Sequence, residues 1–326
     1  MGNFLNIRIG HLKIIDHLIL GISLPETQGT FLGNPAKMEI QAVAMSSWDQ
    51  ISQGLKDGDI AGGFITAPLA MDLFEAGLDI SLLMFTHRSG SLLVYNRAAG
   101  VQQIQDFMGK TILIPHRLCV QHMLLHKFMA AKGMNLKLSG ETSWDDQSIW
   151  AEPVPPGLMP EMLEMDEDGD ITAFMSADPF GTLAIEKGNG KRLLTSQDLW
   201  KNHPCCCFVI KSDLLNSHGD ELQELVRLFF ESARTLDTQL KGEGPMDDMI
   251  LDQAAFFLEQ SRDIICQALE NSGITYSPNL LVPEKTQLDI IQTYMNTTMK
   301  ILPHTIDLDA FIKPAFADKA LAELVP

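Results

Sequence analysis

Two stretches of the sequence read almost alike: DGDIAGGFITAPLAMDLFEAG at residues 57–77 and DGDITAFMSADPFGTLAIEKG at residues 168–188. In each, an Asp-Gly turn leads into a short apolar strand, and a proline then stands where a helix begins, because the first N–H groups of a helix need no intrahelical partner. Each helix ends at a glycine. One inserted residue, Asp178, separates the two patterns. The repeat predicts two similar α/β lobes, with chance similarity between two ordinary strand–helix units as the alternative.

The rest of the chain extends this alternation of strands and helices and then changes character. Alternating elements are typical of an α/β fold with mostly parallel sheets, and the sequence after residue 212 favours helices alone. Residues 221–240 have the clear 3.6-residue periodicity of an amphipathic helix. Further strands are expected at 7–12, 38–44, 80–85, 92–95, 112–115, 149–154, 192–195 and 205–210, further helices at 17–24, 48–57, 120–132, 158–165, 247–258, 262–271, 284–295 and 308–312, and a loop at 25–36.

Composition narrows the function classes. The chain has 326 residues, 45% of them hydrophobic, and a formal net charge of −18. This length supports two domains with their own cores, and the acidic charge argues against nucleic acid or an anionic membrane surface as a partner. A small anionic ligand stays compatible, because a buried site responds mainly to local dipoles and charges. No apolar run is long enough for a transmembrane helix, and no signal segment is recognised, so we expect either a trimmed mature form or a cytoplasmic protein.

The sequence contains no recognisable catalytic, cofactor or metal motif. P-loop, GxGxxG, GxSxG and HExxH patterns are absent. The five cysteines, at 119, 205, 206, 207 and 266, have no zinc spacing and form no disulfide framework, so we interpret them as small buried hydrophobes. His122 and His126 have metal-ligand spacing on a helix but lack a third ligand. We therefore predict no catalytic residue, no cofactor and no metal.

Candidate ligand-binding residues follow from topology. In open α/β sheets, ligands bind beyond the carboxyl ends of the strands, close to helix N-termini. Ala67 is a poor N-cap, which would leave N–H groups of its helix free for an anion, whereas Asp178 can cap its own helix or accept from a ligand. Arg88 is equally consistent with anion binding and with a solvated loop. The predicted binding residues are His11, Thr66, Ala67, His87, Arg88, Ser89, His116, Arg117, Ser176 and Asp178.

A resemblance to a known family rests on several short motifs spread over nearly the whole chain. The sequence resembles the substrate-binding proteins of the nitrate/sulfonate/bicarbonate class of ABC importers. The motifs are the opening stretch 7–17, Lys110-Thr111-Ile112, Pro155-Pro156 before a helix, Asp168-Gly169-Asp170 running into Ala177-Asp178-Pro179-Phe180, and Leu199-Trp200-Lys201-Asn202-His203-Pro204.

The resemblance implies a type II periplasmic-binding-protein fold, with two Rossmann-like lobes joined by crossovers near Tyr95 and Cys206 that act as a hinge. Lobe 1 would comprise residues 1–95 and 207–326, including the C-terminal helices, and lobe 2 residues 96–206. The implied function is that of a monomeric solute-binding receptor without catalytic activity, working outside the cytoplasm with an ABC-transporter membrane permease. Its ligand would be a small oxyanion or an organic sulfonate or carboxylate, with a neutral heterocycle as second choice.

Two alternatives use the same fold. A cytosolic ligand-sensing domain would differ only in its context. A second resemblance is to thiamine-pyrimidine synthases, which carry an iron-associated Cys-Cys-Cys-Phe-Cys run. Cys205-Cys206-Cys207-Phe208 matches the first four positions of that run, but Val209 replaces the last cysteine. That resemblance implies an enzyme in place of a receptor.

Overall fold

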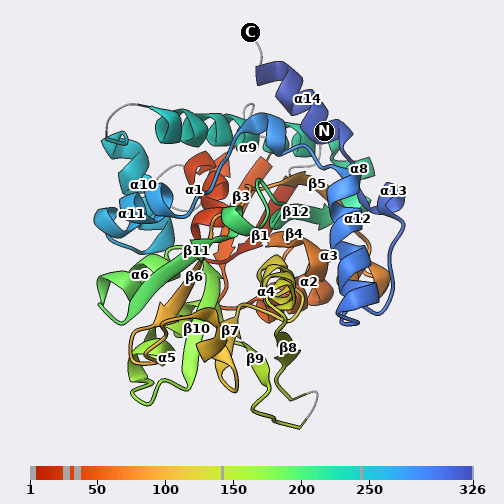
Figure 1. Cartoon of the computed structure of the whole chain (residues 1–326). Helices are drawn as coiled ribbons and strands as arrows, with labels where there is room; N and C mark the ends of the chain where they lie inside the picture. Colours follow the sequence, from red (N-terminus) through yellow and green to blue (C-terminus); the bar gives the residue numbers. More distant parts are fainter. Residues whose placement is uncertain (1–4, 25–29, 33–37, 141–142, 243–244, 325–326) are drawn as a thin grey trace.

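The computed structural model describes residues 5–24, 30–32, 38–140, 143–242 and 245–324. Two six-stranded sheets lie in separate halves of the molecule, one above the other in Figure 1, with the C-terminal helices around the upper half. The loop predicted over 25–36 lies largely outside the described residues. The α/β class and the two-lobed architecture predicted from the sequence are confirmed.

The sheet of the first lobe has a parallel centre, an antiparallel strand β2 at one edge and an antiparallel strand β12 next to the other edge. β1 pairs in parallel with β3 and β4, whereas β12 pairs antiparallel with both β4 and β5. In spatial order the strands are β2 (Thr30–Leu32), β3 (Met38–Ala44), β1 (Leu5–His11), β4 (Gly62–Thr66), β12 (Cys206–Lys211) and β5 (Ile80–Phe85).

The sheet of the second lobe, followed from β8, has the same pattern from its second strand onward; its first strand, β8, pairs in parallel with β9, whereas β2 is antiparallel to β3. β7 pairs in parallel with β9 and β10, whereas β6 pairs antiparallel with β10 and β11. In that order the strands are β8 (Asn135–Leu138), β9 (Ser148–Pro153), β7 (Thr111–Ile114), β10 (Ile171–Ala177), β6 (Ser91–Asn96) and β11 (Gly190–Thr195).

The repeated sequence occupies equivalent places in the two sheets. β4 followed by α3 (Ala67–Glu75) is the first copy, and β10 followed by α6 (Phe180–Glu186) is the second. Both strands are fourth in the orders given above, each between a parallel and an antiparallel neighbour. The sequence repeat therefore corresponds to a structural repeat that covers five of the six strand positions in each sheet and fails at the edge strands β2 and β8.

The chain changes sheet twice. The first crossover, residues 86–90, joins β5 to β6, and the second, near residues 203–205, leads into β12. The second lies close to Cys206, as expected. The first was expected near Tyr95 but lies earlier in the chain, because β6, which contains Tyr95, already pairs with β10 and β11 in the second sheet. The lobe boundaries at residues 95 and 206 stay a prediction, with the topology favouring an earlier first boundary.

The C-terminal helices pack on the first lobe. α9 (Gly219–Lys241) lies across the upper sheet and buries residues at helical spacing, among them Leu222, Val226, Phe229 and Phe230. These side chains share one core with β1, β5 and β12. α14 (Ala315–Leu324), which the sequence analysis missed, packs against α9. No helix within the described ranges combines the length and apolarity that a membrane span needs.

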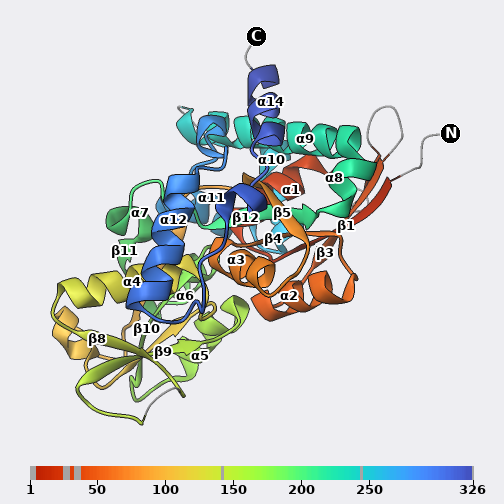
Figure 2. The same cartoon turned by 90° about the vertical axis from the view of Figure 1, so that its right-hand side faces the viewer.

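The remaining helices cover the two sheets and connect their strands (Figure 2). Two of them, α2 and α11, have the bounds that the sequence predicted, 48–57 and 262–271. The remaining helices are α1 (Leu18–Ser23), α2 (Trp48–Asp57), α4 (Val120–Ala131), α5 (Met159–Met165), α7 (Ser196–Leu199), α8 (Asp213–Ser217), α10 (Asp248–Leu258), α11 (Arg262–Asn271), α12 (Lys285–Thr293) and α13 (Leu308–Phe311).

Candidate functional site

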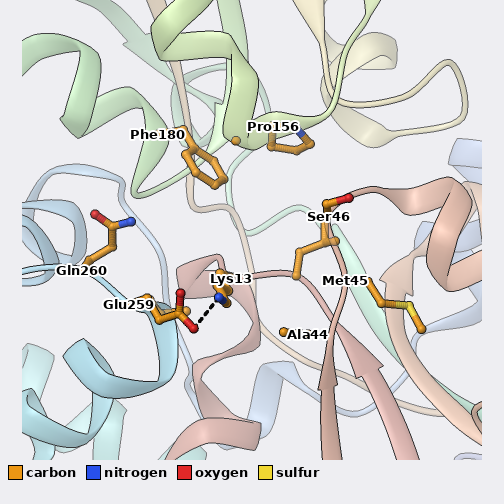
Figure 3. Close-up of a pocket in the computed structure, with 11 residues that line it drawn as sticks. Lys13, Ala44, Met45, Ser46, Pro156, Phe180, Glu259 and Gln260 are labelled. Atoms are coloured by element: carbon orange, nitrogen blue, oxygen red, sulfur yellow. Dashed lines mark ion pairs between the residues drawn. The ribbon is translucent and has the colours of Figure 1, made fainter.

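A pocket of about 360 Å³ lies between the two lobes, at the carboxyl ends of β1 and β3 (Figure 3). This is where ligands bind in open α/β sheets. The first lobe supplies most of the wall, and the turn before α5 and the start of α6 close it from the second lobe. The pocket is lined by Leu12, Lys13, Ala44, Met45, Ser46, Pro156, Gly157, Phe180, Leu258, Glu259 and Gln260.

The first-lobe wall contains the charged groups. β1 and β3 are parallel with His11 opposite Ala44, so the residues that follow them, Lys13 and Ser46, reach the same edge of the sheet. Lys13 Nζ lies 2.5 Å from Glu259 Oε1. The side chains of Lys13 and Glu259 are 34% and 70% exposed, so solvent screens this ion pair and an anionic ligand can compete with Glu259 for the ammonium group.

The second-lobe wall is apolar. Phe180 begins α6 and points toward the pocket from above in Figure 3, beside Pro156. Its position depends on Asp178, whose carboxylate accepts hydrogen bonds from the backbone N–H and the hydroxyl group of Thr182, each 2.9 Å long. Burial raises the pKa of Asp178 to about 7. Asp178 thus caps its own helix, one of the two interpretations considered above.

A backbone hydrogen bond joins the lobes beside the pocket. The N–H of Ile15, in the short 3-10 helix η1 (Ile15–His17), donates to the carbonyl of Asp178 over 2.8 Å. The side chain of His116, in the second lobe, lies 3.5 Å from Asp49 Oδ1 of α2, in the first. The structure therefore represents a state in which the two lobes touch on both sides of the hinge.

The ten residues predicted to bind ligand do not line this pocket. All except His116 and Arg117 are buried. Three of them lie in the first crossover, at 87–89, and four lie where the repeat strands lead into their helices, at 66, 67, 176 and 178. Their assignment as ligand-binding residues stays a prediction.

His87 and Ser89 lie in the first crossover. His87 Nε2 lies 3.0 Å from Asp16 Oδ2, with both side chains fully buried. Burial alone would lower the pKa of His87, but the adjacent Asp16 carboxylate raises it to about 10. The hydroxyl group of Ser89 donates to Gln197 Oε1 over 2.6 Å. These contacts connect the crossover to residues of both lobes.

Arg88 points toward the C-terminal helices. Its Nε donates to the carbonyl of Leu280 over 2.5 Å, its Nη1 donates to Gln287, and its guanidinium lies 4.3 Å from the centre of the Phe85 ring. The side chain is fully buried among protein groups. Its contacts are those of a residue that fastens the crossover to the C-terminal segment.

The free helix N-terminus predicted at Ala67 is only partly present. Thr66, the N-cap of α3, makes no capping hydrogen bond, but the Ala67 N–H donates to the carbonyl of Cys205 over 2.9 Å. The hydroxyl groups of Thr66 and of Ser176, in β10, are buried and make no hydrogen bond. These two residues occupy nearly equivalent places in the repeated unit.

The other predicted residues make protein contacts. The His11 ring stacks on Phe257 with centroids 4.4 Å apart, and burial lowers its pKa to about 4. Arg117 Nη2 donates to the carbonyl of Ile301 over 3.4 Å. Of the histidine pair considered for metal binding, Nδ1 of His126 lies 2.9 Å from the hydroxyl group of Tyr294.

None of the residues that line this pocket is among the ten predicted from the sequence. Ser46 stands just before the helix predicted at 48–57, although the topological rule for strand ends applies to it and to Lys13. Phe180 and Pro156 belong to the motifs that carry the family resemblance. Residues near 13, 156 and 259 meet across the cleft. A single sequence contains no local pattern that predicts contacts between segments so far apart.

Together the two sheets and the pocket between them define a two-lobed α/β protein with the fold of the periplasmic binding proteins. The chain belongs to the NMT1-like family, whose model matches residues 6–243. One curated relative is the nitrate import ATP-binding protein NrtC of Synechocystis sp., 23% identical over 232 residues. This match covers 66% of the chain but 33% of the relative, so the chain spans about a third of the relative's length.

Solved structures of low sequence identity have the same fold. The periplasmic nitrate-binding protein NrtA from Synechocystis superposes with a TM-score of 0.80 at 15% identity, covering 100% of this chain and 90% of that one. The alkanesulfonate-binding protein SsuA from Xanthomonas axonopodis pv. citri, solved with MOPS bound, gives 0.74 at 14% identity, covering 96% and 99%. At these identities the similarity shows the fold alone.

Proposed function

We propose that this protein is the solute-binding receptor of an ABC importer and that it closes its two lobes on a small organic anion. The single observation that carries the proposal is the pocket between the lobes, with the ammonium group of Lys13 on one side and the ring of Phe180 on the other. An anionic head group suits the first and an apolar body the second. A pocket of this kind orients a ligand with few polar contacts and much apolar surface.

The size and lining of the pocket favour an organic sulfonate or carboxylate over a bare inorganic oxyanion. About 360 Å³ is many times the volume of a nitrate or bicarbonate ion, and most lining residues are apolar. Among the described lining residues, Lys13 is the one cation. The relatives' names, which include nitrate import and alkanesulfonate binding, agree with a small anion.

The proposal includes the absence of catalysis. Of the described residues that line the pocket, none is a histidine or a cysteine, and the one hydroxyl group is that of Ser46. Cys205, Cys206 and Cys207, which suggested the enzyme alternative, are buried and outside the pocket. A membrane permease partner and a location outside the cytoplasm belong to the same proposal, supported by the names of an import relative and a periplasmic neighbour. We also propose a monomeric state.

Ligand screening tests this function. Native mass spectrometry of the purified protein would detect a co-purified ligand, and a thermal-shift panel would compare nitrate, bicarbonate, alkanesulfonates, carboxylates and pyrimidines. A ligand at 100 times its dissociation constant adds about 2.7 kcal/mol to the free energy of unfolding, which raises the midpoint measurably. We expect the largest shift with an organic sulfonate or carboxylate. No shift with any anion, or turnover of a panel compound, contradicts the proposal.

A further inference from the structure

Four potential metal ligands converge at the hinge. Asp16 lies in η1 of the first lobe, His87 in the first crossover, and Cys205 and Cys206 at the second. One ligand atom from each lies within 4.8 Å of the other three, and all four residues are buried. None of them lines the interlobe pocket, so this cluster is separate from the proposed solute site.

The spacing of these atoms is close to that of a tetrahedral metal centre. His87 Nε2 is 3.0 Å and Cys206 Sγ is 3.9 Å from Asp16 Oδ2. Zinc–ligand bonds of about 2.0–2.3 Å at tetrahedral angles place ligand atoms roughly 3.3–3.8 Å apart. These two separations lie on either side of that range, and no pair of ligand atoms in the cluster is more than 4.8 Å apart, so side-chain shifts of up to about 1 Å would bring the four atoms into it.

Polar groups in the cluster lack partners. Asp16 Oδ1 is buried without a hydrogen bond, and His87 Nε2 makes no well-directed hydrogen bond although it lies near the carboxylate. Leaving such groups unsatisfied in the interior costs about 1–3 kcal/mol each, and more when they are charged. A cation bound by His87 Nε2 and the Asp16 carboxylate would give the nitrogen a partner and neutralise the buried carboxylate.

The surroundings support a built site. A Cβ atom on Gly90 would lie 3.1 Å from Asp16 Oδ1, so glycine leaves room beside the carboxylate. The other ring nitrogen of His87, Nδ1, lies 3.0 Å from the hydroxyl group of Thr86. Metal-binding histidines usually have such an outer partner, which fixes the orientation of the ring.

We propose that Asp16, His87, Cys205 and Cys206 bind one thiophilic divalent cation of the Zn²⁺ type. Two thiolates, one imidazole and one carboxylate form a closed four-coordinate set that suits zinc, whereas magnesium and calcium prefer oxygen ligands alone. Bound metal would tie both crossovers to η1 and stiffen the hinge. This replaces our sequence-based prediction of no metal. It is independent of the identity of the solute.

Metal binding by the full chain is the first test. Because the cluster is buried, the reduced protein is refolded with Co²⁺ or Zn²⁺ without oxygen, and bound metal is counted after gel filtration. We expect one equivalent, with thiolate-to-cobalt charge-transfer absorption that Zn²⁺ abolishes. Substoichiometric binding, or bound cobalt without the thiolate bands, overturns the proposal.

Cysteine variants locate the site. Cys206→Ser should weaken cobalt binding by at least about tenfold, the loss that even outer-shell substitutions cause. Cys207→Ser is the matched control, because its thiol is equally buried but contacts the carbonyl of Ile65 and lies outside the cluster. It should keep one equivalent and the same spectrum. Equal loss in both variants, or no loss in Cys206→Ser, overturns the assignment.

A measurement on the unmodified protein covers the case in which a variant fails to fold. X-ray absorption at the zinc edge reports the number of sulfur neighbours directly. We expect two sulfur and two nitrogen or oxygen neighbours. Coordination without sulfur would place the zinc elsewhere, for instance on surface histidines, and would overturn the proposal. Ligand affinity measured on the same samples separates this result from a failure of the proposed solute-binding function.

Discussion

Lys13 is the residue on which the proposed anion selectivity rests. Lys13→Met keeps the aliphatic stem but removes the charge, so we expect an organic anion found in the screen to bind about tenfold more weakly, which corresponds to about 1.4 kcal/mol. Isothermal titration at two salt concentrations measures this, and the affinity of the variant should depend less on salt. Lys132→Met, at the end of α4 and outside the pocket lining, is the control. Unchanged affinity in Lys13→Met would exclude Lys13 from the site.

Glu259 should have the opposite effect. Its carboxylate competes with the ligand for Lys13, and it lies at the end of α10 with a left-handed backbone conformation, φ 53°. Glu259→Gln should therefore tighten anion binding several-fold. The effect is no larger because solvent screens an exposed ion pair. Isothermal titration calorimetry with the same ligand shows whether the affinity rises or falls. Weaker binding would show that Glu259 itself recognises the solute, for example through an amino group.

Substitution of Arg88 is expected to lower stability, whereas the sequence alone suggested that it would weaken ligand binding. Arg88→Met removes hydrogen bonds to Leu280 and Gln287 and leaves their acceptors unpaired in the interior, so we expect a loss of about 2–4 kcal/mol in the free energy of unfolding. Urea denaturation measures it. The ligand dissociation constant of the folded fraction should stay within twofold, and a larger change would return Arg88 to the binding site.

At the scale of single residues, the sequence pointed to the edge of the sheet where the pocket lies but not to the side chains that line it. The rule about strand ends selected the edge where Lys13 lies, but it also selected residues such as His87 and Arg88, because it cannot say which side chains turn inward. That choice depends on contacts over long separations, such as the 192 residues between Arg88 and Leu280. The partners that would have decided it are distant in sequence and have no motif.

At the scale of elements, the start of α6 should respond to pH through Asp178. Its pKa is raised from 3.8 to about 7, so the folded protein keeps a proton that the unfolded chain releases near pH 4. This contribution to stability is fully present below about pH 4 and is lost as the pH rises through 7. Asp178→Asn keeps an acceptor for the Thr182 N–H but has no titrating carboxyl group, so it lacks this pH-dependent contribution. Relative to the variant, the unmodified protein should lose on the order of 2 kcal/mol between pH 5 and pH 8.

Comparison of the two proteins isolates this group from the buried histidines. Burial lowers the pKa of His11 to about 4 and that of His203 to about 3, so both add stability as the pH rises through the ordinary histidine range near 6.5. They do so equally with and without Asp178. Denaturant titrations at several pH values give the difference directly. Parallel pH profiles would mean that Asp178 is ionised in the folded protein.

Elements with a strong periodic pattern were predictable, and short or peripheral ones were not. The Asp-Gly turns, the apolar strands and the prolines of the repeat gave β4, α3, β10 and α6, and the apolar positions of α9 gave its buried face. β8 is only four residues long, with its first residue exposed, so its pattern is too short to recognise. The sequence favours a first crossover near Tyr95 because β6 is apolar and follows β5 after five residues, as a hairpin strand of the same sheet would.

For the whole molecule, the two-walled pocket predicts closure on ligand. Solute that contacts Lys13 of one lobe and Phe180 of the other can favour the closed state only by binding it more tightly than the open one. Small-angle X-ray scattering should therefore show a smaller radius of gyration with saturating ligand than without it. The same radius in both states, together with normal affinity, would mean that the lobes are already closed in the free protein.

The order of the strands also sets the order in which the two halves can be completed as the chain leaves the ribosome. Every strand of the second sheet lies between residues 91 and 195, so this half can fold once that segment has emerged. The first sheet begins with residue 5 but waits for β12, at 206–211, which separates β4 from β5. Until then the facing edges of β4 and β5 have unpaired backbone groups, and such edges invite association with other chains. The strand that completes the first sheet is thus synthesised after every strand of the second sheet.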